Sequence, residues 1–301
     1  MQLLSDSELN HVYAERVRSQ LFGAGRPSAN PRLVIVGGQP GAGKTLATLS
    51  AMRELGRAGD AVAYINGDEL RPLHPGYAAL VAADNTTAAD KTGTDVGLWV
   101  ERGIREAAAG RISSVIETKM RQPEVVRRTP EQFTKAGFEF EMRVVVVAPE
   151  LSRLAIYERF ARALGTSGAL PRFTLPSYHT DALAQMPATL RAVATLANVV
   201  RFVNRQGEEL YSSRSSPVVP HVALAELRRQ PLPEVERERI VQQWVQLVQR
   251  LDREGVPAMV REGVRSEQLR FTALQEQGRA APSGRPQEGW TADAKVRARV
   301  A

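Results

Sequence analysis

Cysteine is absent from the 301 residues of the sequence. Disulfide bonds and thiolate metal sites are therefore excluded, which fits a cytoplasmic protein. A run of about 18 apolar residues is also lacking, so we expect no transmembrane helix and no membrane partner. The N-terminus has neither a basic flank nor a long apolar core, and it does not predict a secretory signal.

Blocks of like charge are missing as well, although the net charge is +7 and the pI is about 10. Arginine supplies most of the positive charge and is mixed with glutamate along the chain. A basic balance can indicate nucleic acid, a membrane surface or small anionic substrates. Without a Lys/Arg block, nucleic acid is not favoured as a partner. Hydrophobic residues make up 43% of the chain, which predicts a globular fold.

Short apolar runs that are typical of buried strands alternate with helical patterns. We predict strands at 32–38, 61–67, 112–118, 143–149 and 198–205. Between them we predict helices at 7–22, 45–56, 76–110 with a polar break at 84–95, 123–136, 151–164 and 180–197. This alternation predicts an α/β fold in which a parallel sheet has helices on both faces.

The character of the chain changes after Ser213. Residues 213–220 resemble a linker, and an apolar stripe then runs along one face of a charged helix, formed by Ile240, Val241, Trp244, Leu247, Val248 and Leu251. We therefore predict a first domain over residues 1–215 and a helical extension over 216–301, with a flexible tail from Gly278. The stripe can pack on the first domain, pair with another chain or cover a site.

The segment Gly-Gln-Pro-Gly-Ala-Gly-Lys-Thr matches the phosphate-binding pattern G-x-x-x-x-G-K-[ST] and lies between a predicted strand and a predicted helix. Its backbone N–H groups can close around phosphate oxygens at a helix N-terminus. Lys44 would reach the β- and γ-phosphates, and Thr45 would ligate Mg²⁺. The predicted nucleotide-binding residues are Gly38, Gln39, Pro40, Gly41, Ala42, Gly43, Lys44 and Thr45.

The reaction is suggested by what surrounds this loop. No N-K-x-D motif selects guanine, and the third predicted strand ends in Glu117 and Thr118 instead of the acidic pair of motor ATPases. A small-molecule kinase is therefore favoured. Asp68 follows the second predicted strand, at the sheet edge that faces ligands. It can accept the proton of an attacking hydroxyl, or cap a short helix, or do both.

Several other charged residues are candidates for substrate contacts. Arg71 is either a surface charge or a substrate contact. Glu117 can orient a sugar hydroxyl, hold a water bound to Mg²⁺, or pair with Arg121, which could otherwise reach a diphosphate. Arg159 and Arg172 flank a predicted loop or lid at 165–177, and arginines in such a lid can offset charge in phosphoryl transfer. Their positions alone are also consistent with ordinary solvated side chains.

These motifs, in this order, resemble the zeta toxin family, the kinase toxins of bacterial toxin–antitoxin pairs. The resemblance rests on GGQPGAGKT, the Asp68 element that ends in His74-Pro75, VIET with Arg121, IYERF, and RFVNRQGEELYSS. It implies a P-loop kinase-like fold, and ATP and Mg²⁺ as cofactors. It also implies phosphorylation of the sugar 3′-hydroxyl of UDP-N-acetylglucosamine, a peptidoglycan precursor, by a growth-inhibiting toxin. An antitoxin protein is the implied partner, acting at the N-terminal helix.

The resemblance also assigns roles to individual residues. It implies that Asp68 is the general base and that Lys44, Arg159 and Arg172 act on the phosphates. The substrate contacts that it implies are Glu101, Glu117, Arg121 and Thr129.

One segment departs from the family pattern. The family often has Glu-Gly-Thr-Gly-Arg where this chain has Glu117-Thr118-Lys119-Met120-Arg121. The bulkier Lys119 and Met120 would reshape the sugar pocket. The acceptor therefore stays open between a UDP-amino sugar, another nucleotide sugar and a dinucleotide. A rival hypothesis from another class is a non-catalytic ATP-binding interaction module.

Overall fold

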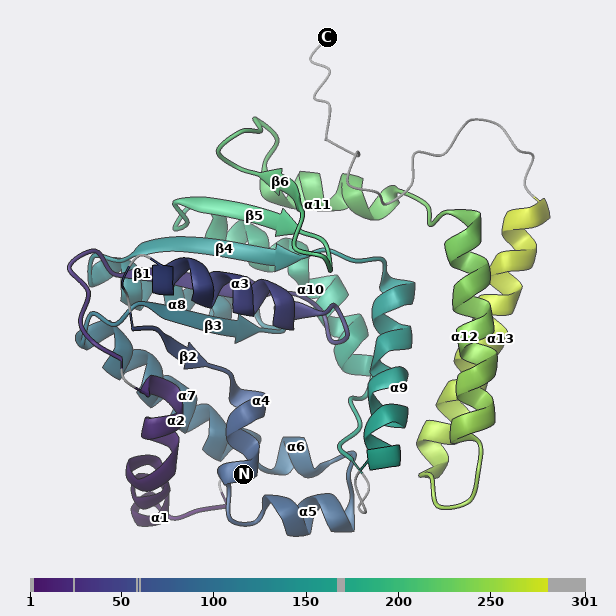
Figure 1. Ribbon diagram of the computed structural model, residues 1–301, viewed down its shortest axis with the longest axis horizontal. Coiled ribbons are helices and arrows are strands. Elements are labelled where there is room, and N and C mark those ends of the chain that lie inside the picture. The colour runs from purple at the N-terminus through teal and green to yellow at the C-terminus, as the bar shows by residue number, and fades with distance from the viewer. Residues whose placement is uncertain (1–2, 24, 58, 60, 167–170, 281–301) are drawn as a thin grey trace.

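A mixed sheet forms the centre of the molecule (Figure 1). The computed structural model describes residues 3–280 except 24, 58, 60 and 167–170. Within them, the sheet has six strands in the order β2-β3-β1-β4-β5-β6, of which the first five are parallel and β6 is antiparallel to β5. The strands are β1 Arg32–Gly37, β2 Ala63–Ile65, β3 Ser114–Thr118, β4 Glu139–Val145, β5 Val199–Val203 and β6 Glu209–Ser212.

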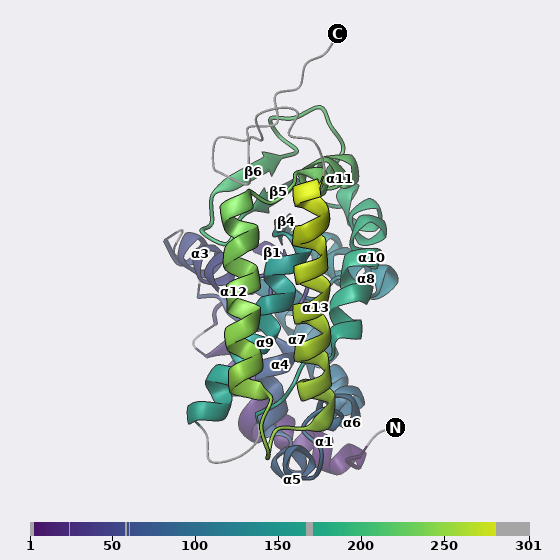
Figure 2. The same ribbon diagram turned by 90° about the vertical axis from the view of Figure 1, so that its right-hand side faces the viewer.

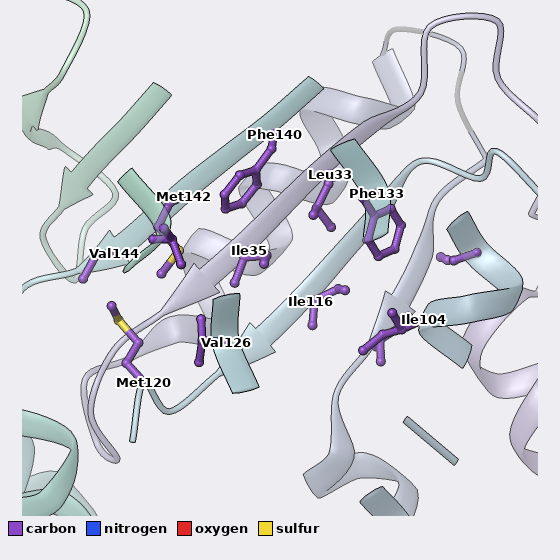
Figure 3. Close-up of a cluster of buried hydrophobic side chains, with 14 of the residues drawn as sticks. Leu33, Ile35, Ile104, Ile116, Met120, Val126, Phe133, Phe140, Met142 and Val144 are labelled. Carbon is purple, nitrogen blue, oxygen red and sulfur yellow. The ribbon is translucent and has the colours of Figure 1, made fainter. Parts of the chain in front are cut away.

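Helices cover both faces of this sheet, because alternate side chains of each strand point to opposite faces. Leu33 and Ile35 of β1 join the larger core cluster with residues of α7, α8 and α10 (Figure 3). Val34 and Val36 pack in a second cluster with residues of α3. The predicted α/β sheet with helices on both faces is thus confirmed. These helices are α3 Lys44–Arg57, α7 Gly93–Ala109, α8 Pro123–Lys135 and α10 Pro176–Ala194.

The other helices follow the predicted pattern with interruptions. The predicted helix 7–22 is α1, a π-helical turn over 13–17 and α2, and the predicted helix 76–110 is divided into α5, α6 and α7. The remaining bounds are α1 Asp6–Val12, α2 Arg18–Phe22, α4 Gly67–Leu70, a 3₁₀ turn Arg71–Leu73, α5 Tyr77–Ala83, α6 Ala88–Lys91, α9 Pro149–Thr166, α11 Pro220–Arg229, α12 Glu234–Leu251 and α13 Ala258–Ala280.

Two strand predictions were misplaced. The predicted strand 61–67 shortens to β2, because the side chain of Asn66 accepts a hydrogen bond from the backbone N–H of Asp68 and begins α4. The predicted strand 143–149 lies earlier in the chain, at β4. Its polar start is a strand because Phe140 and Met142 alternate into the core, and Pro149 begins α9.

The C-terminal helices pack on the rest of the chain in two ways. α11 adds Ala223, Leu224 and Leu227 to the larger core cluster of the sheet. α12 and α13 lie side by side as a C-terminal hairpin and pack along α9 (Figure 2). The division at residue 215 stays a prediction. The predicted tail from Gly278 begins inside α13, and its part from residue 281 lies outside the described residues.

The N-terminal segment is tied down by a buried carboxylate. Asp95 accepts hydrogen bonds from the backbone N–H groups of Leu3 and Leu4, and it lies 3.1 Å from Nε2 of His74. Nδ1 of His74 accepts from the N–H of Gly76 at 3.1 Å. Among the described helices, none is long and apolar enough to cross a membrane.

Candidate active site

The phosphate-binding loop connects the end of β1 to the first turn of α3, in the context that the motif predicts (Figure 1). Two of its glycines have left-handed backbones, with φ of 77° at Gly41 and 86° at Gly43. A Cβ atom at Gly41 would lie 1.9 Å from the carbonyl oxygen of Ser152 on α9. Glycine is therefore required here by the close packing on α9 as well as by the backbone conformation.

Side chains on both sides hold this loop in place. Gln39 Nε2 donates to the carbonyl oxygen of Val147 at 3.1 Å. Arg205, which follows β5, donates to the carbonyl oxygens of Gly41 at 2.7 Å and Leu151 at 2.9 Å. Arg205 was not predicted as a site residue; its signal was its place in the Asn-Arg element after the last parallel strand.

Lys44 and Thr45 open α3 and line a cavity of about 420 Å³. Lys44 Nζ donates to the carbonyl oxygen of Gly38 at 3.0 Å. Burial by the surrounding loop lowers the pKa of Lys44, whereas the negative charges of Glu117 and Asp68 oppose that shift. Among the residues that the structure describes, no group of three or more His, Cys, Asp or Glu side chains could hold a metal ion.

Asp68 lies in the same cavity, in the first turn of α4. Its carboxylate contacts three cations: Nζ of Lys119 at 3.1 Å, a terminal nitrogen of Arg172 at 3.0 Å and Nε of Arg71 at 3.2 Å. Burial raises the pKa of Asp68, but the three cations together hold it well below its ordinary value. The alternative that Asp68 caps the helix is wrong, because Asn66 is the cap.

Lys119 was predicted to reshape the sugar pocket, but its contact with Asp68 was not predicted. It lies two residues beyond Glu117, and its ammonium group contacts the half-buried carboxylate of Asp68. Burial lowers the pKa of Lys119 to about 8, with Asp68 opposing and Arg172 adding to the shift. The feature of the sequence that could have identified Lys119 is its position next to the end of a strand, where side chains face the ligand crevice.

Glu117 and Arg121 do not pair with each other. Glu117 accepts hydrogen bonds from the hydroxyl groups of Thr48 at 2.7 Å and Tyr64 at 3.1 Å. Arg121 forms an ion pair of 3.5 Å with Asp181, and its guanidinium lies 4.0 Å from the ring centre of Tyr178. The alternative of a Glu117–Arg121 ion pair is therefore wrong, because both side chains have other partners.

The two arginines that flank the predicted lid converge on this cavity. Arg159 of α9 lines it and donates to the hydroxyl of Thr174 at 2.7 Å. Arg172 reaches it through the ion pair with Asp68. Residues 167–170 of the predicted lid lie outside the described residues. Two arginines that are 13 residues apart in the chain thus approach one cavity, Arg159 as part of its lining and Arg172 through Asp68.

The other predicted substrate residues border two hollows next to the cavity. Asp68, Arg71, Glu117 and Arg121 line the first of them. Glu101, Glu117 and Thr129 line the second. Glu117 borders the cavity and both hollows, so the predicted residues follow one continuous stretch of surface. Arg71 is also a structural residue here, because it donates to the carbonyl oxygen of Ala89 and the hydroxyl of Thr92.

Met120 keeps a backbone conformation that normally belongs to glycine. Its φ is 54° and its side chain is fully buried beside Met142, above Gly37 (Figure 3). A non-glycine residue in this conformation costs about 1–2 kcal/mol, whereas deleting a buried methionine side chain costs about 2–5 kcal/mol. Packing in the core therefore outweighs the strain in the backbone.

We expect Met120→Gly to lower the free energy of unfolding by about 1–3 kcal/mol, the difference between the packing lost and the strain relieved. Urea denaturation measures it. Met120→Leu, which conserves volume, should cost less than about 1.5 kcal/mol. A glycine variant that is as stable as the original chain would show that the strain, and not the packing, dominates.

A mostly parallel sheet with a phosphate-binding loop at the end of β1 and a carboxylate among cations at the same cavity defines a P-loop kinase-like protein. The family model for zeta toxin matches residues 18–216. The chain belongs to the zeta toxin family.

Known proteins of this family align over most of the chain. Toxin PezT of Streptococcus pneumoniae is 26% identical over 242 residues, which cover 80% of this chain and 94% of that protein. Toxin zeta of Enterococcus hirae is 28% identical over 192 residues, which cover 63% of this chain and 66% of that protein. A solved structure from the PezAT chromosomal toxin–antitoxin system of S. pneumoniae shares the fold, with a TM-score of 0.69 at 22% identity, covering 82% of this chain and 99% of that one.

Proposed function

We propose that this protein is an ATP-dependent kinase that phosphorylates the sugar 3′-hydroxyl of UDP-N-acetylglucosamine or a related UDP-amino sugar, and that it acts as a growth-inhibiting toxin. One observation carries the proposal: the carboxylate of Asp68 and the P-loop residues Lys44 and Thr45 line the same cavity, which Arg159 also lines. A hydroxyl acceptor beside Asp68 would therefore lie next to phosphates held by the P-loop.

The P-loop residues fit ATP with Mg²⁺. The left-handed glycines give a loop whose backbone can surround phosphate oxygens, and Lys44 is placed to contact them. The hydroxyl of Thr45 would hold Mg²⁺ together with phosphate oxygens and waters. When bound, Mg²⁺ neutralises charge on the phosphates.

Asp68 would orient the acceptor hydroxyl and accept its proton. Its lowered pKa keeps it ionised at neutral pH but makes it a weak base, so aiming the oxygen contributes more than pulling the proton. Arg159 and Arg172 would offset the charge that develops on the transferred group. In this structure Arg172 and Lys119 neutralise Asp68. Phosphates would compete with Asp68 for these two cations.

The acceptor would extend from Asp68 into the two neighbouring hollows. Arg71 and Arg121 offer positive charge for a diphosphate, and Glu117, Glu101 and Thr129 offer acceptors and a hydroxyl for sugar groups. Lys119 supports a second candidate, because it adds a cation beside Asp68, where the acceptor hydroxyl would lie. A different nucleotide sugar or a dinucleotide, with negative charge nearer to that hydroxyl, would suit it better.

A panel of acceptors tests the proposal. The full chain is incubated with ATP, Mg²⁺ and either UDP-N-acetylglucosamine, other UDP-sugars or a dinucleotide, and mass spectrometry detects the addition of one phosphoryl group. We expect transfer to a UDP-amino sugar. Transfer only to another acceptor would show that the proposed substrate is wrong and that the proposed kinase activity is right. No transfer to any acceptor, with salt-dependent binding to nucleic acid, would favour the interaction module instead.

An antitoxin protein and a cytoplasmic site of action complete the proposal. A structural relative from a toxin–antitoxin system supports an antitoxin partner. We expect this partner to act at the N-terminal helices α1 and α2. Co-expression with a candidate antitoxin should restore growth. Charge reversal of exposed side chains on this segment, Glu15→Lys with Arg16→Glu, should abolish that rescue if this is where it binds, whereas toxicity without the antitoxin should be retained.

A further inference from the structure

The C-terminal hairpin has a core of its own, separate from the core of the sheet. Apolar residues of α12 and α13 pack with residues of α9 and with Phe173 in one buried cluster, which includes Tyr157, Phe160, Trp244, Val260 and Phe271. The two helices lie against the outer side of α9 in both views (Figures 1 and 2). Because α9 also carries Arg159, the hairpin supports the element from which that arginine projects.

A chain of aromatic contacts leads from the hairpin to the two arginines. Trp244 of α12 lies edge-on to Tyr157 of α9, with ring centres 5.2 Å apart. Tyr157 contacts Phe173 at 5.2 Å, and Phe173 contacts Phe160 at 5.3 Å. In the sequence Phe173 lies between Arg172 and Thr174. Arg172 contacts Asp68, and Thr174 contacts Arg159.

A second connection, made of polar groups, leads from the hairpin towards the P-loop. Glu267 of α13 accepts from Arg153 at 2.7 Å, and Arg153 lies 3.4 Å from Nδ1 of His179. Nε2 of His179 lies 2.7 Å from the hydroxyl of Ser152, which also accepts from Nε2 of Gln39 at 3.3 Å.

The protonation state of His179 determines which groups donate and which accept the hydrogen bonds in this connection. Burial, with Arg153 adding to the effect, lowers the pKa of His179 to about 4, so the ring is neutral at pH 7. Because Arg153 donates to Nδ1, the proton is on Nε2 and is donated to Ser152.

We propose that the C-terminal hairpin positions the phosphoryl-transfer residues, through the contacts Trp244–Tyr157–Phe173. This inference rests on the proposed kinase function. Arg159 and Arg172 must lie at one point, although they come from a helix and from a separate segment. Trp244 of the hairpin packs against Tyr157 of α9, and Tyr157 packs against Phe173. The hairpin thereby holds the contact that fixes the position of α9 relative to the segment of Arg172. Loss of the aromatic contact lowers the rate of transfer, since a small misplacement of a positioned group is costly. The polar connection from Glu267 to Gln39 stays in place, so the affinity of the P-loop for ATP is unchanged.

Two substitutions disturb this contact from opposite directions. Trp244→Ala removes the ring that Tyr157 rests on. Gly263→Ala adds a Cβ atom that would lie 2.5 Å from the hydroxyl of Tyr157, and it would otherwise favour the helix. Because the ring of Tyr157 is held between Phe173 and Trp244, it cannot yield without moving Phe173.

Steady-state kinetics with the accepted substrate is the first measurement. We expect kcat to fall by about tenfold or more in both variants, with KM for ATP within about twofold. Trp244→Phe should restore kcat, because a ring still contacts Tyr157. Adding Tyr157→Phe to Gly263→Ala should also restore it, because the colliding oxygen is gone. A folded Trp244→Ala variant with an unchanged kcat would overturn the proposal.

A matched control separates positioning from a general loss of stability. Ile240 is as deeply buried on α12 but is outside the aromatic chain. Ile240→Ala should lower the melting temperature while keeping most of kcat. If it lowers kcat as much as Trp244→Ala does, a general loosening explains both and the specific contact is wrong.

Hydrogen exchange gives a readout that needs no kinase activity. The N–H of Phe173 donates to the carbonyl oxygen of Asn85 at 3.3 Å. In Trp244→Ala, exchange at residues 172–175 should become faster, while exchange in β1 and α3 stays the same. Unchanged exchange at 172–175 overturns the positioning role by itself. If no acceptor in the panel is phosphorylated, only the proposed kinase function is overturned.

Discussion

Asp68→Asn is expected to lower kcat for phosphoryl transfer by about 10²–10⁴-fold, with ATP affinity within about twofold. Asparagine keeps the size of the side chain but cannot accept a proton. It also removes the charge that holds Lys119 and Arg172 at this point. Single-turnover kinetics measures the transfer step, and calorimetric titration with ATP measures binding.

The control for this prediction is Asp252→Asn, at a carboxylate that also pairs with an arginine, Arg265, but on the C-terminal hairpin. It should leave kcat unchanged. Toxicity on expression should follow the same order, with growth restored by Asp68→Asn only. If Asp68→Asn still transfers phosphate at a rate within threefold of the original chain, Asp68 is not the base.

Arg159→Ala is expected to lower kcat by about 10³-fold or more, the range seen when an arginine that stabilises the transferring phosphate is removed. The substitution removes the hydrogen bond from Arg159 to Thr174, so the free energy of unfolding should change by only about 1 kcal/mol. Arg159→Lys should recover part of the rate, because the charge remains but the planar fork of donors does not.

The matched control is Arg162→Ala. Arg162 lies three residues after Arg159 in α9, and its side chain is exposed. Its kcat should match that of the original chain. Thermal unfolding of both variants shows whether the fold is retained. An Arg159→Ala variant with full kcat and normal stability would place the charge-stabilising role on Arg172 alone.

Local patterns were enough to predict the P-loop and the sheet, because both depend on short-range rules. The loop needs its residues in consecutive order, and buried parallel strands need continuous apolar runs. The same rules failed at β4, where alternating polar and apolar residues start the strand, and at β6, whose antiparallel pairing with β5 depends on a turn between them.

The partners of the charged residues were harder to predict. Asp68 has an ordinary local alternative as a helix cap, and only the structure shows that Asn66 takes that place. Glu117 and Arg121 have the right spacing for a surface pair, yet Tyr64 and Tyr178 contact them instead. These partners come from other elements, so no spacing rule within one segment could have identified them.

The sequence by itself determined the class of fold, the phosphate-binding loop and the family, because each is encoded in consecutive residues whose chemistry is local. Only the tertiary structure decided which cations surround Asp68, that Lys119 is one of them, and that a hairpin far along the chain supports α9 and Phe173. The physical reason is that ion pairs and aromatic contacts depend on distances of a few ångströms between distant segments, and folding alone sets those distances.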